Sequence, residues 1–385
     1  MTEYFNLHDG FEQKYGISGD DNAFLAQTIL KLRTKRPYVK DSQEFTIMVN
    51  EETSVIQLWI RTVGCSFSKV GSCSVCDYWI GNRLEHPDEI VKKALSPYKG
   101  QYTTLIFNTC GSPFDYKELI LEEQERIWKA IEQMGFQIVI IETHMNTVDE
   151  CRLNLLKKII HAYLVIEIGL ESSNTQILKY SLNKKVSMEK LKDIIQLVHK
   201  YRMGCCANIL LGVPFLSVSA RIDDCICSVK DALEAGADTC VVFPINLKEY
   251  TLISFLARNG LYEPVNGWEL IMVLNSFAAE ELECINIAWY EEREQNNLSY
   301  ENPMIPPAFC PDCRWIVYRQ LSKYSAATKG KVREDIVKQL CMIECQCRNA
   351  FMERYAYGSM DNRKVDLDFY YARIKSLMEG GIENG

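Results

Sequence analysis

Three cysteines lie close together in one stretch of the chain, just after a predicted buried strand. Cys65, Cys73 and Cys76 have the spacing C-x7-C-x2-C, and Gly64 comes directly before the first of them. Three thiolates in one loop can bind one metal centre and leave a coordination position open, as on one iron of a [4Fe–4S] cluster. An open position of that kind can bind a small chelating ligand. The spacing therefore predicts a reactive metal centre.

Zinc binding, disulfide formation and core packing are the alternatives for these three cysteines. Zinc also binds C-x2-C pairs, but a structural zinc site needs four closed ligands, and no further cysteine or histidine follows Cys76 before His86. A disulfide is disfavoured in a reducing compartment, and cysteines also pack in cores as small apolar side chains. Among these alternatives we favour the iron–sulfur cluster.

The residues around the cysteines resemble the cluster loop of radical S-adenosylmethionine (SAM) enzymes, in particular those of the archaeosine-synthase and Elongator types. The resemblance is carried by Arg61-Thr62-Val63-Gly64-Cys65 and by Gly71-Ser72-Cys73-Ser74-Val75-Cys76-Asp77-Tyr78, and it extends over roughly residues 45–350. The family's commonest spacing is C-x3-C-x2-C, so the seven-residue gap is a departure. The resemblance implies a [4Fe–4S] cluster on Cys65, Cys73 and Cys76, with SAM on the open iron. Reductive cleavage of SAM would then give methionine and a 5′-deoxyadenosyl radical, which abstracts hydrogen from a substrate.

Regular alternation of strands and helices positions this loop. Residues 45–49 and 55–62 are expected to form a hairpin, and five more strands follow, each preceded by a helix, over 103–108, 137–142, 163–169, 205–211 and 238–244. Six βα units in succession indicate a parallel sheet with helices outside. We therefore predict an α/β fold, a partial (β/α)6 barrel, because two more repeats would be needed for an eight-stranded barrel.

Active sites of parallel barrels lie at the carboxyl ends of the strands, so the turns there are candidate SAM contacts. By the resemblance, the turn after the second strand holds the amino group of SAM, the Gly-Leu-Glu-Ser turn contacts the ribose, and the turn after the fifth strand lies against adenine. The expected cofactor-binding residues are Tyr78, Asn108, Gly111, Ser112, Glu142, Glu171, Asn208, Gly212 and Pro214. We assign no catalytic residue from the sequence, and His144 alone is more typical of a structural histidine.

A second group of cysteines follows the proline-rich segment 303–307. Cys310 and Cys313 form a C-x2-C pair, and Cys345 and Cys347 form a C-x-C pair. Four thiolates fill a tetrahedral zinc shell, and a second iron–sulfur cluster or unmetallated thiols are the alternatives. Cys341 is an alternative ligand, because it precedes Cys345 by four residues and would share a helix face with it.

Composition limits the function. The chain has 385 residues, a net charge of −8 and 16 cysteines. This charge argues against a general nucleic-acid binder, although basic runs at 31–40 and 310–333 could grip phosphates or simply be solvated faces. The sequence shows no apolar run that could span a membrane and no signal peptide, which indicates a cytoplasmic protein.

We expect three regions: an N-terminal helical segment (1–43), the barrel (44–300) and a cysteine-rich extension (301–385). The resemblance suggests tRNA carrying a 7-deazaguanine–lysine adduct as substrate, and a small molecule or peptide in a biosynthetic pathway is the alternative. A zinc-stabilised nucleic-acid or protein-binding module without chemistry is a third hypothesis, but it leaves the six βα units unexplained. An electron donor such as flavodoxin or ferredoxin is the expected partner.

Overall fold

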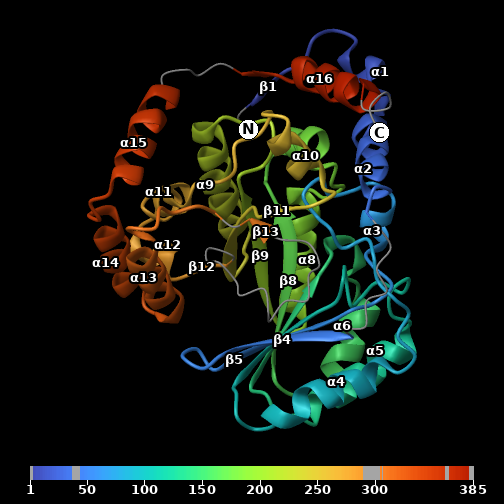
Figure 1. The fold of residues 1–385 in the computed structure, drawn as a ribbon. Coiled ribbons are helices and arrows are strands. Elements are labelled where there is room, and N and C mark those ends of the chain that lie inside the picture. The colour runs from blue at the N-terminus through green and yellow to red at the C-terminus, as the bar shows by residue number, and fades with distance from the viewer. Residues whose placement is uncertain (1–2, 37–43, 289–303, 306, 360–363, 381–385) are drawn as a thin grey trace.

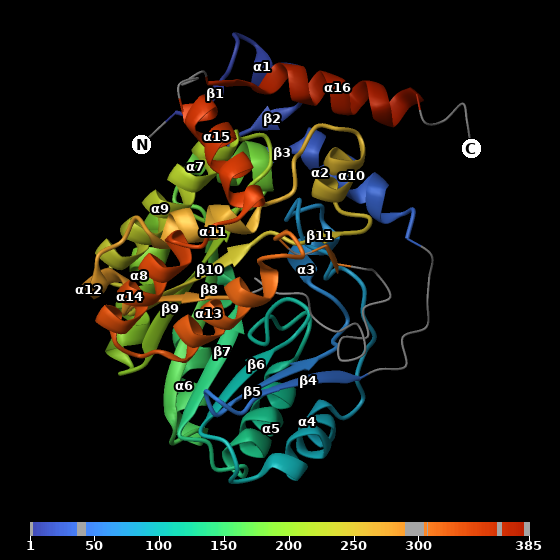
Figure 2. The ribbon, with the colours of Figure 1, turned by 60° about the vertical axis from the view of Figure 1, so that its left-hand side comes forward.

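A curled eight-stranded sheet forms the centre of the part of the chain that this computed structural model describes, residues 3–36, 44–288, 304–305, 307–359 and 364–380. Its strands lie in the order β12-β10-β9-β8-β7-β6-β5-β4 (Figures 1 and 2). They are β4 (Phe45–Asn50), β5 (Val55–Ile60), β6 (Thr104–Asn108), β7 (Ile138–Thr143), β8 (Tyr163–Glu171), β9 (Gly204–Leu211), β10 (Thr239–Pro244) and β12 (Ile285–Ile287). β4 and β5 pair antiparallel and the other neighbours pair parallel. The predicted hairpin and partial (β/α)6 barrel are confirmed, and β12 adds a short parallel strand at the open edge.

The helices between the strands cover the outside of the sheet, and their ends follow from local sequence signals. They are α4 (Pro87–Leu95), α5 (Leu121–Glu132), α6 (Glu150–Ile159), α8 (Met188–Lys200) and α9 (Val218–Glu234). α4 begins with Pro87 and two acidic residues, which suit a helix N-terminus. The side chain of Asp149 caps α6 by accepting from the amide of Arg152 at 2.9 Å. Each helix therefore starts where the sequence offers a cap or a compatible first turn.

One helix starts later than the sequence suggested. The sequence predicts a helix over 116–134, whereas α5 begins at Leu121. Residues 112–120 instead form turns around the buried carboxylate of Glu118, which accepts hydrogen bonds from backbone and side-chain donors. That network, which no periodicity reveals, replaces the first turn of the expected helix.

The cysteine-rich extension packs directly on the open edge of the sheet. It contains α13 (Arg314–Ala326), α14 (Gly330–Cys341) and α15 (Gln346–Ser359), which lie against α11 (Gly267–Leu274), α12 (Ala279–Leu282) and α9 (Figure 2). Leu321 and Leu340 are fully buried and belong to the same apolar core as the barrel. Arg333 donates to the carbonyls of Leu282 at 2.8 Å and Ile285 at 2.7 Å. The extension is therefore anchored by apolar packing as well as by its cysteines.

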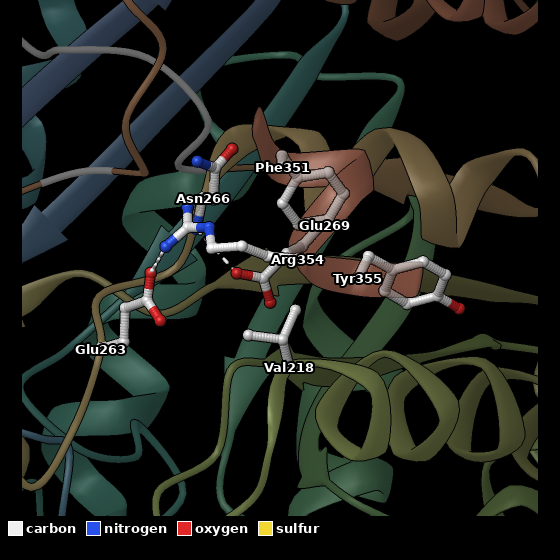
Figure 3. A pocket seen from close by; sticks show the side chains of 7 residues that line it. All are labelled: Val218, Glu263, Asn266, Glu269, Phe351, Arg354 and Tyr355. Carbon is white, nitrogen blue, oxygen red and sulfur yellow. Dashed lines mark hydrogen bonds and ion pairs between the residues drawn. The ribbon is translucent and has the colours of Figure 1, made fainter. Parts of the chain in front are cut away.

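Helix α15 of the extension also contacts the barrel. Phe351, Arg354 and Tyr355 of α15 line a small hollow together with Val218 and Glu269 (Figure 3). Arg354 forms an ion pair with Glu263 at 2.6 Å across its rim.

The two terminal segments pack together at one end of the molecule. α16 (Leu367–Gly380) lies beside α1 (Phe11–Lys14) in both views, and β1 (Phe5–Asn6) pairs with β14 (Val365–Asp366) (Figures 1 and 2). Tyr371 stacks on Phe24 of α2 (Ala23–Arg33) with 4.7 Å between ring centroids. No helix among the described residues is both long and apolar enough to traverse a membrane. The boundary expected at 300–301 lies outside the described residues.

Candidate radical SAM site

The cysteine loop begins shortly after β5 and contains a short helix of its own. Cys65 begins α3 (Ser66–Lys69), where its sulfur accepts from the amide of Ser68 at 3.4 Å. The residues that make the Cys65–Cys73 gap unusually long fold into this helix. Cys65 is buried, whereas Cys73 and Cys76 are partly exposed.

Two glycines allow the loop to fold back on itself. Gly64 has a φ of +93°, and a Cβ there would lie 2.6 Å from the carbonyl oxygen of Trp79. Gly71 has a φ of +85°, and its Cβ would lie 2.6 Å from the carbonyl oxygen of Ala26 in α2. Only glycine fits both the conformation and the close approach. Cys73 itself has a φ of +64°, so the backbone is strained at one of the three cysteines of the loop.

Arg33, at the end of α2, lies under the loop. It is 5% exposed, and its guanidinium is 4.7 Å from the ring of Trp79. Its nitrogens donate to the carbonyl oxygens of Ser68, Ser72 (3.0 Å), Cys73 (3.2 Å) and Cys76 (3.3 Å). The basic run at 31–40 is therefore not uniformly a solvated face or a phosphate-binding surface, because Arg33 is buried. The part of the run beyond Arg36 lies outside the described residues.

Electrostatics favour a metal at these thiols. Burial raises the pKa of all three, that of Cys76 to about 12, and the charge of neighbouring cysteines adds to the shift at Cys65 and Cys76. Buried thiolates are therefore costly here unless a cation offsets their charge. The donor set fits a [4Fe–4S] cluster.

The turn after β6 lies against the cysteine loop. A Cβ on Gly111 would lie 2.6 Å from Cβ and 2.7 Å from Sγ of Cys65. The amides of Gly111 and Ser112 donate to the carboxylate of Glu118 at 3.2 and 2.9 Å. The Ser112 hydroxyl is fully buried and hydrogen-bonded to Thr143 and Thr147. The amides of Gly111 and Ser112 and the Ser112 hydroxyl therefore already have hydrogen-bond partners within the protein.

Sequence reasoning missed Glu118, which organises this turn. It is 2% exposed, and burial raises its pKa, although the donors around it oppose that shift. Thr62 and Thr109 also donate to it, at 2.6 and 3.0 Å. In the sequence, Glu118 is only one more carboxylate inside an expected helix, and such a side chain usually points into solvent.

Tyr78, Glu142, Glu171 and Asn208 line the inside of the barrel. Glu142 and Glu167 are paired in register on β7 and β8, and Gly169 is paired with Asn208 on β9. Glu171 ends β8 at a β-bulge with a φ of +73° and pairs with Lys184 at 2.5 Å. The ring of Tyr78 lies 4.3 Å from the ammonium of Lys248 in β11 (Leu247–Lys248). These residues share one end of the barrel with the cysteine loop.

The turn after β9 is held by packing on neighbouring segments. Gly212 has a φ of +102°, and its carbonyl accepts from the hydroxyl of Tyr262 at 2.7 Å. The carbonyl of Pro214 accepts from Ser181 at 2.6 Å. A Cβ on Gly212 would lie 2.1 Å from a methyl of Val265. Gly212 is therefore required for packing, whether or not the turn also touches adenine.

His144 also supports the cysteine loop. Its ring stacks on Phe67 of α3 at 3.6 Å, and its Nδ1 accepts from the amide of Asn146. Burial lowers its pKa well below the usual value, so the ring is neutral near pH 7. The expectation of a structural histidine agrees with these contacts.

The C-terminal cysteines form a compact second group. The sulfurs of Cys310, Cys313, Cys345 and Cys347 all lie within 4.8 Å of one another, and the closest pairs are 3.2–3.6 Å apart. The indole N–H of Trp268 donates to Cys347 Sγ at 3.1 Å. Cys341 is not part of the group, because α14 ends at that residue and Cys345 follows beyond the helix.

This fold and loop are those of a radical SAM enzyme. Residues 59–223, from the end of β5 into α9, match the profile of the Radical SAM superfamily. The match to this superfamily over that segment implies a [4Fe–4S] cluster and SAM as cofactors.

Proteins of similar sequence and structure are found among archaea. The chain is 24% identical to an uncharacterized protein of Methanocaldococcus jannaschii over 80% of this chain and 82% of that protein. It is 27% identical to the archaeosine synthase subunit beta of Methanosarcina acetivorans over 59% of this chain and 68% of that protein. Among solved structures, Elp3 of Methanocaldococcus infernus matches at 15% identity with a TM-score of 0.45, covering 63% of this chain and 60% of that one.

Proposed function

We propose that Cys65, Cys73 and Cys76 bind the [4Fe–4S] cluster and that SAM binds its open iron at the carboxyl ends of the strands. When bound, these cofactors supply hydrogen-atom abstraction from a substrate. The protein's own contribution is to fix the loop through Arg33 and to bury the thiols, which keeps water from the centre. An external one-electron donor, such as flavodoxin or ferredoxin, would reduce the cluster.

We further propose that the substrate is a tRNA carrying a 7-deazaguanine–lysine adduct, whose C–N bond is broken. The observation that carries this proposal is the similarity to archaeosine synthase subunit beta in two organisms. An exposed aromatic and basic surface on α13 also supports it. Trp315 is 67% exposed, and the guanidinium of Arg314 lies 5.1 Å from its ring. Unpaired bases stack on such side chains.

The test is an anaerobic incubation of the reconstituted enzyme with SAM, reductant and tRNA bearing the adduct. We expect 5′-deoxyadenosine to form in step with loss of the adduct. The matched control is the same tRNA with unmodified guanine at that position. If adduct-bearing and control tRNA give equal 5′-deoxyadenosine and the adduct persists, tRNA is not the substrate.

We propose that the C-terminal cysteines bind one zinc ion. Four Zn–S bonds of about 2.3 Å in a tetrahedron place the sulfurs about 3.8 Å apart, close to the 3.2–3.6 Å seen here. A [4Fe–4S] cluster would need wider spacing, because each cysteine binds its own iron. The Trp268 N–H stabilises the thiolate that it contacts. The site is closed, so its role is structural.

A further inference from the structure

The inside of the barrel carries more negative than positive side chains. Lys184 pairs with Glu171 at 2.5 Å, and Lys248 pairs with Asp77 at 3.0 Å. Within each of these two pairs the charges balance. Glu142 and Glu167 remain, and neither has a basic partner within ion-pair distance among the described residues.

The two remaining carboxyl groups are neighbours. Glu142 on β7 is the register partner of Glu167 on β8. Alternation along β7 places Glu142 on the face opposite the fully buried Ile141, which packs under the outer helices. Both carboxyl groups therefore face the inside of the barrel.

An independent observation indicates that a ligand is bound here. Asn208 is 5% exposed, and its side chain hydrogen-bonds to Glu167. Its Oδ1 is buried and has no hydrogen-bond partner among the described residues. An unsatisfied buried acceptor beside two carboxyl groups without cations is costly. A ligand with hydrogen-bond donors removes that cost.

The electrostatics of the pair agree with its geometry. Burial and the neighbouring Glu167 raise the pKa of Glu142 to about 8, and Lys184 and Lys248 only partly oppose the shift. Burial also raises the pKa of Glu167. Burial and like charge therefore disfavour ionisation of both carboxyl groups together, and a bound group with N–H donors would lower that cost.

We propose that Glu142, Glu167 and Asn208 form a substrate subsite that binds a base edge with adjacent N–H donors, a ring N–H beside an exocyclic amine. This inference rests on the proposed function, because a 7-deazaguanine presents such an edge. Three acceptors lie side by side, whereas a phosphate or carboxylate group would be repelled. Glu142 and Asn208 are then substrate-binding residues instead of the SAM contacts that the sequence suggested.

The first experiment needs no variant. Binding of 7-deazaguanine and of 7-deazahypoxanthine, which lacks the exocyclic amine, is measured by calorimetry on the reconstituted holoenzyme with SAM present. We expect the amine-bearing base to bind about 10–100-fold more tightly, the range for hydrogen bonds to charged groups. Equal affinities, or no binding of either base, would overturn the subsite.

The second experiment uses the double variant Glu142→Gln/Glu167→Gln, with Glu122→Gln/Glu189→Gln as the matched control on exposed helix positions. We expect the barrel variant to lose the discrimination between the two bases, and the control variant to keep it. A large loss of SAM affinity in the barrel variant alone would assign the pair to the cofactor instead. The isosteric change keeps the packing, and a thermal melt checks the fold.

Failure of the inference and failure of the proposed function give different results. If the adduct-bearing tRNA is turned over and the barrel variant keeps the wild-type KM, the subsite is wrong and the function stands. If the two bases are discriminated but the tRNA is not turned over, the subsite stands and the tRNA proposal falls.

Discussion

The guanidinium of Arg33 donates to the carbonyl oxygen of Cys73 at 3.2 Å, which links the last residue of α2 to the cysteine loop. The same guanidinium reaches three further carbonyls of the loop. Because carbonyl dipoles and thiolates both favour a nearby cation, Arg33 shapes the loop and offsets the charge of its thiols.

We therefore predict that Arg33→Met lowers the iron content per chain after anaerobic reconstitution. Four buried carbonyl oxygens would lose their charged donor, and we expect about 3 kcal/mol lower stability by denaturant unfolding. The matched control is Arg36→Met, because Arg36 also contacts the ring of Trp79, at 5.4 Å. If Arg33→Met keeps the iron content and stability of the control, the guanidinium does not hold the loop.

Gly111→Val should disturb the cluster loop directly. A Cβ at this position meets Cys65 and comes 2.2 Å from Glu118 Oε1. Overpacking of this kind lowers the stability of a protein by about 1–3 kcal/mol. The displacement of the backbone would move Cys65, a proposed cluster ligand, directly. We expect lower thermal stability together with lower iron content. A variant with wild-type stability and full iron would show that the contact is unimportant.

Glu118→Gln should destabilise the turn after β6. The carboxylate accepts four hydrogen bonds, and the amide of glutamine cannot accept with its nitrogen. We expect a loss of about 1–3 kcal/mol for the donors left unpaired, seen by urea unfolding. Glu122→Gln, at an exposed position four residues along, should be neutral. Equal stabilities of the two variants would contradict this role.

Cys310→Ser together with Cys313→Ser should release about one zinc per chain and leave the iron of the barrel site. We expect limited proteolysis to cut near residues 307–313 and 343–347. The helices α13 and α14 should stay protected, because Leu321 and Leu340 are buried in the core of the protein. Loss of about four irons instead would mean a second cluster.

The barrel could be predicted because its signals are local. Each parallel strand is a short apolar run that ends in a glycine or polar turn, and these turns fall in the order expected of a barrel site. Spacing also predicted the grouping of Cys310 and Cys313 with Cys345 and Cys347, but it left Cys341 as an alternative ligand that the structure places outside the group. The three-residue β12 offered no comparable signal.

The residues that hold the site together could not be predicted. Arg33 and Glu118 read as solvated charges on helices, and their partners are backbone groups far along the chain. Arg333 was likewise part of a basic run, yet it is buried against carbonyls of the barrel edge. These carbonyls and amides come close to the charged side chains only in the tertiary structure.

Iron and SAM measurements on wild type and Cys73→Ala test the central claim most directly. Both proteins are reconstituted anaerobically. We then measure their iron and sulfide content and their SAM cleavage. We also record the electron paramagnetic resonance spectrum of the reduced cluster with and without SAM. We predict about four irons per chain at the barrel site of the wild type, a spectrum that changes when SAM is added, and 5′-deoxyadenosine. Cys73→Ala should fold and keep its C-terminal metal but lose the spectrum and the cleavage. Full SAM cleavage by Cys73→Ala, or a wild type without a SAM-sensitive cluster, would contradict the assignment.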